Sequence, residues 1–195
     1  PGETIGTAST DTGKGPATWT HDHTEWGVQD LVGNVWEWLD QMMLDEGQVI
    51  TTLDNNPEII EDNWNKHVAF FDSPTANTEG TDSIGSPKLS SGISNRNGAL
   101  GDNGHGNPTT SNAHFAAVEK AADYNKIELL RRLLIESESA STVNGAIYCR
   151  NYGRRFAIRG GSWLIGSNAG MGALGLHSAR TIKNSNIGFR PGLFV

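Results

Sequence analysis

The sequence predicts a single α+β domain that is rich in loops and carries one long polar insertion. Three observations predict this class. The chain has 195 residues, which is enough for one domain with a sizeable hydrophobic core but short for two full domains. Only 36 % of its residues are hydrophobic and 24 are glycine, which disfavours a helical bundle. Short strand-like stretches alternate with connections rich in Asn, Ser and Gly, as expected of a loop-rich domain.

A hairpin is predicted in the N-terminal third of the chain. The stretches 35–39 and 48–53 are rich in residues that favour strands. Asp45-Glu46-Gly47 lies between them and has the composition of a tight turn. Because side chains alternate along a strand, Trp36 and Trp38 should share one face of the first strand.

The middle of the chain is polar and then helical in pattern. Residues 72–112 consist mainly of Ser, Gly, Asn, Thr and Asp, which predicts a long polar surface insertion. A helix is predicted from a cap at Ser111 or Asn112 to near Glu136. Its apolar face would be formed by Phe115, Val118, Ala122, Leu130 and Leu134. Strands follow at 145–149 and 154–159, with irregular backbone from Trp163 to Asn186.

Composition limits the classes of protein. No apolar run approaches the roughly 20 residues that span a bilayer, so we expect no membrane insertion of this fragment. The chain begins at Pro1, and we expect that it is N-terminally truncated, with any export signal or anchor upstream. Cys149 is the single cysteine, which excludes an internal disulfide framework and a multi-cysteine zinc site.

The charges are separated along the chain. All acidic residues lie at or before Glu138, whereas residues 139–195 carry only basic charge. These basic residues are next to glycine and aromatic residues in segments with a strand-like sequence pattern. They do not form a basic cluster that would bind nucleic acid. We therefore expect no nucleic-acid partner, and arginines that pair with the acidic N-terminal part. The basic residues of this tail are Arg150, Arg154, Arg155, Arg159, Arg180, Lys183 and Arg190.

Three blocks resemble a known family. They are Gly-Val-Gln-Asp-Leu-Val-Gly-Asn-Val-Trp-Glu-Trp at 27–38, Arg-Gly-Gly-Ser-Trp at 159–163 and Asn-Ile-Gly-Phe-Arg at 186–190. In this order they resemble the formylglycine-generating-enzyme branch of the C-type lectin fold. The resemblance implies that residues 1–195 form one domain of that fold.

That branch contains both enzymes and binding proteins, so the function has to be inferred from the residues at the site and not from the fold. The formylglycine-generating enzymes use two cysteines after the Gly-Gly-Ser block, and Ile165 and Gly170 occupy the matching positions here. Neither residue forms a thiolate. The related sulfoxide synthases need an iron site built from histidines, and His21 and His23 are the only close pair. The sequence therefore predicts a protein that is not an enzyme.

Residues 159–190 instead resemble the variable region of diversity-generating retroelement proteins. In such systems error-prone copying at adenines diversifies a displayed receptor, and Asn codons are the richest targets. Many residues here are reachable from such codons, although Met171 and Lys183 are not. The alternative is an undiversified lectin-fold loop. The predicted ligand-binding positions are Ser162, Leu164, Ile165, Met171, Gly172, Gly175, His177, Ser178, Thr181, Ile182, Lys183, Asn184 and Ser185.

The resemblance implies a hypervariable receptor or adhesin, displayed extracellularly on a virion or a cell surface. Its expected partner is a protein or a glycan on a target cell, which the sequence does not name. No cofactor is required for such binding. Two alternatives stay open, namely an oxidase of the formylglycine-generating type, which the missing cysteines disfavour, and a structural assembly module of a phage particle.

The first block also implies a structural calcium ion. In the formylglycine-generating enzymes the matching block binds calcium, which would give side-chain oxygens from Asp30 and Glu37 and backbone carbonyls from Gly33 and Val35. An all-oxygen set suits calcium. The alternative is that backbone amides or arginines of the basic tail satisfy Asp30 and Glu37.

Overall fold

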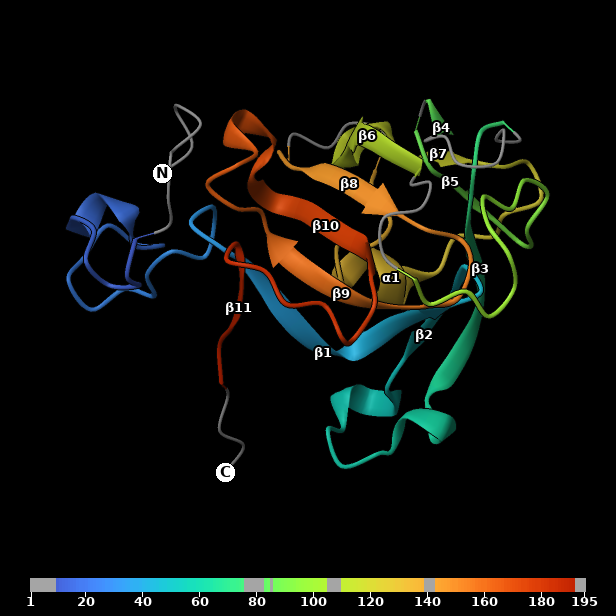
Figure 1. Cartoon of the computed structure of the whole chain (residues 1–195), viewed down its shortest axis with the longest axis horizontal. Coiled ribbons are helices and arrows are strands. Elements are labelled where there is room, and N and C mark those ends of the chain that lie inside the picture. The colour runs from blue at the N-terminus through green and yellow to red at the C-terminus, as the bar shows by residue number, and fades with distance from the viewer. Residues whose placement is uncertain (1–9, 76–82, 85, 105–109, 139–142, 192–195) are drawn as a thin grey trace.

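One large mixed β-sheet dominates the computed structural model of the chain, which is mostly β and rich in loops (Figure 1). The structure describes residues 10–75, 83–84, 86–104, 110–138 and 143–191. No helix in that part of the chain is long and apolar enough to cross a membrane. Its strands are β1 (Trp36–Asp45), β2 (Gln48–Thr51), β3 (Asn65–Asp72), β4 (Ser83–Ile84), β5 (Lys88–Ser90), β6 (Thr110–His114), β7 (Glu119–Lys120), β8 (Ala146–Cys149), β9 (Arg154–Gly160), β10 (Gly170–Ser178) and β11 (Ile187–Phe189).

The strands follow the order β4-β6-β8-β10-β9-β1-β2-β3-β5-β7, and β11 pairs in parallel with the start of β1. The predicted hairpin is confirmed, because β1 and β2 pair antiparallel with Asp45 opposite Gln48. Glu46 and Gly47 form the turn with φ values of 51° and 85°. A two-residue type I′ turn requires positive φ at both of its central residues, which Gly47 adopts without steric cost.

The two faces of the sheet carry separate apolar clusters. The larger cluster contains Leu44, Phe71, Ile147 and Leu174 and packs against Leu130 of α1 (Glu128–Arg132). This side of the sheet is therefore the main core, and α1 covers part of it (Figure 1). The opposite face holds a smaller cluster that includes Trp36, Trp38, Ile158, Ala173 and Ile187. The prediction that the two tryptophans share a face is confirmed.

The predicted helix from 111 to 136 is wrong. Only Glu128–Arg132 is α-helical; β6, a 3₁₀ turn at Phe115–Ala117 and β7 precede it, and turns and loops make up the remainder. Residues 110–114 pair antiparallel with β8, which satisfies backbone groups that a helix would satisfy internally. Three of the five apolar residues of the predicted face, Phe115, Val118 and Leu130, are still buried, whereas Ala122 is exposed. Tertiary pairing has overridden a helical pattern, as it often does.

Two further expectations need correction. The stretch between Trp163 and Asn186 is not irregular throughout, because it contains β10, which pairs with β8 and with β9. The polar stretch 72–112 is not simply a surface insertion in the part that the structure describes. β5 pairs with β3, and Leu89 within β5 is fully buried. Residues 76–82, 85 and 105–109 of that stretch lie outside the described residues.

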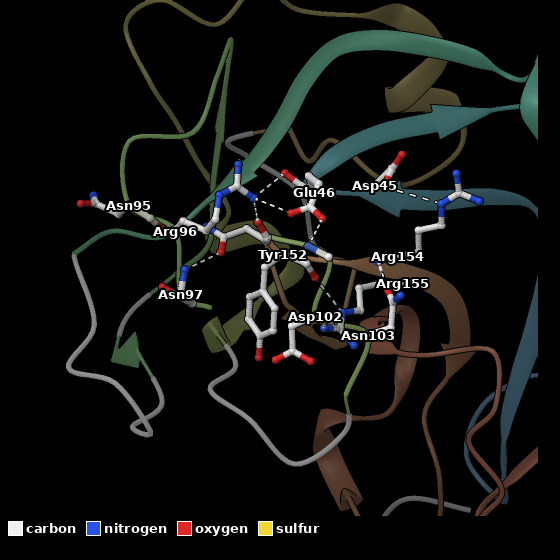
Figure 2. A network of polar contacts seen from close by, with 12 residues as sticks. Asp45, Glu46, Asn95, Arg96, Asn97, Asp102, Asn103, Tyr152, Arg154 and Arg155 are labelled. Atoms are coloured by element: carbon white, nitrogen blue, oxygen red, sulfur yellow. Dashed lines mark hydrogen bonds and ion pairs between the residues drawn. The ribbon is translucent and has the colours of Figure 1, made fainter. Parts of the chain in front are cut away.

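A polar network joins three segments at the β1–β2 turn (Figure 2). The turn is held by Arg96, whose Nη1 donates to the Glu46 carbonyl at 3.0 Å and carboxylate at 3.1 Å. Arg155 in β9 is fully buried and donates to the carbonyl oxygens of Tyr152 at 2.9 Å, Gly104 at 2.9 Å and Asp102 at 2.5 Å. The network therefore attaches residues 102–104 of the polar stretch to β9.

The expected pairing of tail arginines with acidic residues is confirmed for three of them. Arg190 binds Glu37, Arg154 contacts Asp45 at 3.8 Å, and Arg180 pairs with Glu61. In contrast, Arg150, Arg155 and Arg159 lie within the fold and donate to backbone carbonyl oxygens. The basic tail is thus used mainly to hold the fold together.

His67 gives the fold a pH dependence. It is buried in β3, and its Nε2 lies 2.8 Å from the Thr51 hydroxyl. Burial lowers the pKa of His67 below its ordinary value of 6.5, because it disfavours the imidazolium form. The unfolded chain therefore binds the proton more readily, so stability is lost as the pH falls below about 6.5.

We expect His67→Gln to reduce this loss of stability when unfolding by urea is compared at pH 7 and pH 5. An unchanged pH dependence would contradict the assignment.

Candidate functional site

The three sequence blocks that lie far apart along the chain meet in space. The Gly33 amide donates to the Gly160 carbonyl at 3.0 Å, and the Trp163 amide donates to the Asn34 carbonyl at 2.9 Å. The Trp36 amide donates to the Asn186 carbonyl at 2.8 Å. Backbone hydrogen bonds do not depend on side-chain identity, so these contacts form a frame that neighbouring substitutions leave intact.

The backbone conformation at positions 160 and 161 explains why the middle block contains two adjacent glycines. Their φ values are 86° and 82°, in the left-handed region that favours glycine. A Cβ at Gly160 would lie 2.7 Å from the Leu31 carbonyl oxygen, and one at Gly161 would lie 2.8 Å from Cα of Ala169. Larger residues are excluded at both positions, so the chain turns sharply here from β9 into the next loop.

Two loops flank β10 and come together beside β1. The first, residues 161–169, contains a 3₁₀ turn at Gly166–Asn168. The second, residues 179–186, starts beside β9, where Arg180 stacks 4.0 Å above the Phe156 ring, and reaches β1 where β11 begins (Figure 1). Asn186 Nδ2 lies 3.4 Å from the Ser162 hydroxyl, where the loops meet. Both loops are therefore attached to the sheet at each end.

The structure divides the thirteen predicted positions into three groups. Three positions are partly exposed, namely Ile165, His177 and Ile182. Four are buried and offer no contact surface, namely Ser162, Gly172, Gly175 and Ser178. The six exposed positions belong to the two loops and the start of β10, and they are Leu164, Met171, Thr181, Lys183, Asn184 and Ser185.

The two glycines in this set have no room for a side chain. A Cβ at Gly172 would lie 2.9 Å from Cβ of Phe115 and 3.0 Å from the Asn144 carbonyl oxygen. A Cβ at Gly175 would lie 2.6 Å from Cγ1 of the buried Ile158. Sequence reasoning assigned both positions to a replaceable surface, whereas the packing assigns them to the frame. Ser162 and Ser178 join them, since each is only 1 % exposed.

An aromatic row that the sequence did not indicate runs through the Trp36 cluster. Tyr148 of β8 contacts the Trp36 ring edge-on at 6.1 Å between centroids, and His177 at 5.7 Å. Burial raises the pKa of Tyr148, which keeps its phenol protonated at neutral pH. Strand register brings these rings together, because Tyr148 lies opposite Gly175 on the neighbouring strand. No local sequence signal could have revealed this pairing.

The residues implied for calcium are engaged in other contacts. Glu37 accepts hydrogen bonds from Arg190 on both carboxylate oxygens, at 2.6 Å and 3.2 Å. Buried Asp30 accepts the Gly13 amide on Oδ2 at 3.3 Å, whereas its Oδ1 has no partner in the described structure. A calcium ion bound through Glu37 would therefore have to compete with Arg190. Among the described residues no cluster of three His, Cys, Asp or Glu side chains is found. The calcium assignment stays a prediction.

The single cysteine of the sequence, Cys149, lies where its thiol is unreactive. Cys149 is fully buried in the main core, and this burial, with a smaller effect of Asp72, raises the pKa of its thiol. A thiol that stays protonated is a poor nucleophile. The positions that match the enzymes' cysteines lie elsewhere, with Ile165 packed against the Trp36 cluster and Gly170 buried at the start of β10.

The sequence matches no family model, and no curated protein is similar enough to count as related. What the structure shows is a mostly β, loop-rich domain around one large mixed sheet.

Proposed function

We propose that this chain is a ligand-binding receptor or adhesin with a C-type lectin fold, diversified by a retroelement and displayed outside the cell or on a virion. Its target would be a protein or a glycan on another cell. One observation carries the proposal. Nine of the thirteen predicted positions keep exposed or partly exposed side chains, and they lie on β10 and on two loops that the sheet holds at both ends.

This arrangement suits a surface whose chemistry changes while the fold persists. The Gly33–Gly160, Asn34–Trp163 and Trp36–Asn186 contacts use backbone atoms, so substitutions of neighbouring side chains do not remove them. A loop fixed at both ends also loses less conformational entropy when it binds. Leu164 and Met171 are exposed at 43 % and 65 %, and such apolar side chains are useful contacts in an interface.

Binding is favoured over catalysis by the chemistry of the site. The positions of the enzymes' cysteines hold Ile165 and Gly170, and the buried Cys149 stays protonated. A variable surface needs no cofactor, because shape and polar complementarity supply the affinity. A phage assembly role would use the same exposed side chains. It would be favoured if substitutions of Lys183–Ser185 changed particle assembly and left target binding intact.

The encoding DNA tests the proposal. We expect a nearby near-copy of the stretch that encodes residues 159–190, differing from it almost only at adenines, and an adjacent reverse transcriptase gene. The differences should fall in the codons of exposed positions such as Leu164, Thr181 and Asn184, and spare those of Gly172 and Gly175. Absence of the template and the transcriptase would refute diversification. Peptide-cysteine oxidation by the purified protein would refute the assignment as a binding protein.

A further inference from the structure

A recess lies beside β1 where its pairing with β9 shifts register, between Trp38 and Met43. It shares no residue with the thirteen predicted positions. Its volume is about 720 Å³, which falls within the range of sites for small molecules. It is surrounded by β1 at residues 39–42, the end of β2 with the turn that follows, and α1, and the first residue of β3 and Arg159 of β9 complete its lining. Its occupant therefore need not be the target of the loops, and this inference goes beyond the proposed function.

Arg159 lines this recess with a positive charge that lacks a counter-charge. Its Nη2 donates to the carbonyl oxygens of Leu133 at 2.6 Å and Leu134 at 2.8 Å. Its Nη1 is buried and has no hydrogen-bond partner in the described part of the chain. No carboxylate forms an ion pair with Arg159 among those residues, in contrast to Arg154, Arg180 and Arg190. Burial lowers the pKa of Arg159 to about 10, which marks the cost of this placement.

An anion in the recess would offset that cost. Removing a charged group from water is strongly unfavourable unless a partner of opposite charge compensates it. Carbonyl oxygens at the end of α1 bind part of the guanidinium, but they carry no net charge. A carboxylate is the natural partner of a guanidinium, since the two groups match in geometry and charge.

The walls of the recess restrict the rest of the ligand. Leu39, Leu53 and Leu129 surround it and are 37 %, 56 % and 42 % exposed, so apolar surface is left open beside the Arg159 guanidinium. Exposed apolar side chains gathered at a recess are typical of binding sites. Asp40 and Asp54 also line it, and both are exposed. Arg132 lines it too, but this arginine is paired with Glu128 at 3.2 Å. The two aspartates therefore disfavour multiply charged anions such as phosphate esters or dicarboxylates.

We infer that this recess binds a small organic monocarboxylate with an apolar body, its carboxylate beside Arg159 and its body against the three leucines. The inference rests on a half-buried arginine without a counter-charge, an open cavity and apolar walls that occur together.

Octanoate is a suitable probe, with octanamide as its neutral match in size and shape. We expect calorimetry on the whole chain to show octanoate binding at least about tenfold more tightly than octanamide, because only the former carries the counter-charge. Octanoate should also raise the melting temperature of the protein, since it binds the folded state. Equal affinities for the two probes, or no binding of octanoate at millimolar concentration, would overturn the inference.

Two variants separate the recess from the fold. Arg159→Gln should reduce octanoate affinity at least about tenfold while octanamide binding stays unchanged. Should that variant not fold, Leu129→Trp places a larger side chain on the exposed wall and keeps Arg159, and it should weaken both probes. Arg154→Gln is the control, because Arg154 is an exposed arginine of the same strand outside the recess. Octanoate binding that survives Leu129→Trp would contradict the site. Substitutions in the loops should leave octanoate binding unchanged, so failure of the proposed function would be seen separately.

Discussion

Replacing Arg155 with leucine should lower the free energy of unfolding by about 2–4 kcal/mol, because backbone carbonyl oxygens inside the fold lose their hydrogen-bond donor. Arg155 is fully buried and donates to three backbone carbonyl oxygens, those of Asp102, Gly104 and Tyr152. Its guanidinium also lies 4.8 Å from the centre of the Tyr152 ring. Leucine fills part of the space but leaves these oxygens without the guanidinium. The loss is largest at the buried Tyr152, where an unsatisfied carbonyl costs about 1–3 kcal/mol.

The neighbouring Arg154 provides the control for this prediction. Its side chain is 48 % exposed and lies 3.8 Å from Asp45. An exposed ion pair contributes about 0–1 kcal/mol, so Arg154→Leu should change stability little. Urea unfolding followed by tryptophan fluorescence measures both variants. If Arg155→Leu were as stable as the native chain, the network in Figure 2 would not hold the fold, and apolar packing would account for the stability of this end of the sheet.

Replacing Gly175 with asparagine should destabilise the protein by about 3 kcal/mol or more, because an overpacked core and a buried unsatisfied amide act together. A Cβ at Gly175 would lie 2.6 Å from Cγ1 of Ile158 and 3.2 Å from Cε1 of His177. Ile158 is itself buried and holds the Trp36 cluster, so it has little freedom to move. Asparagine is also the residue type that unaltered template codons would place at a variable position.

Met171→Asn is the matched control. Met171 belongs to the same strand and is 65 % exposed. Substitutions at exposed sites usually change stability by at most about 0.5 kcal/mol, and we expect that result here. Thermal melts of the two variants distinguish the frame from the replaceable surface. Equal losses at both positions would show that β10 has no such division.

Local chemistry made some elements predictable. The β1–β2 hairpin could be predicted because its turn depends on two adjacent residues, Glu46 and Gly47, and on strands next to it in sequence. β10 could not, because it lies between β8 and β9 and its residues from Gly172 to Leu176 are buried on both faces. A strand covered on both sides shows no alternation of polar and apolar residues. The helix expected at 111–136 failed because pairing of β6 with β8 is a long-range contact.

The candidate site was predictable to a similar extent. The resemblance of residues 159–190 to a variable region predicted exposed positions there, and Leu164 and Lys183 are exposed. Codon reasoning concerns which residues could vary and says nothing of the space around them, so it could not separate Gly172 or Gly175 from their exposed neighbours. Arg159 was recognised only as part of a block. Its unpaired charge depends on α1 and on the bulge in β1, which the sequence does not show.

The central claim is that a fixed frame carries a surface whose chemistry can be exchanged. It is tested most directly by randomising five exposed loop positions together and measuring the unfolding free energy of many variants. These positions are Leu164, Thr181, Lys183, Asn184 and Ser185. We expect most variants to keep the native stability within about 1 kcal/mol, since surface changes are individually small and nearly additive. Losses of several kcal/mol in most variants would contradict it, because the loops would then belong to the core of the fold.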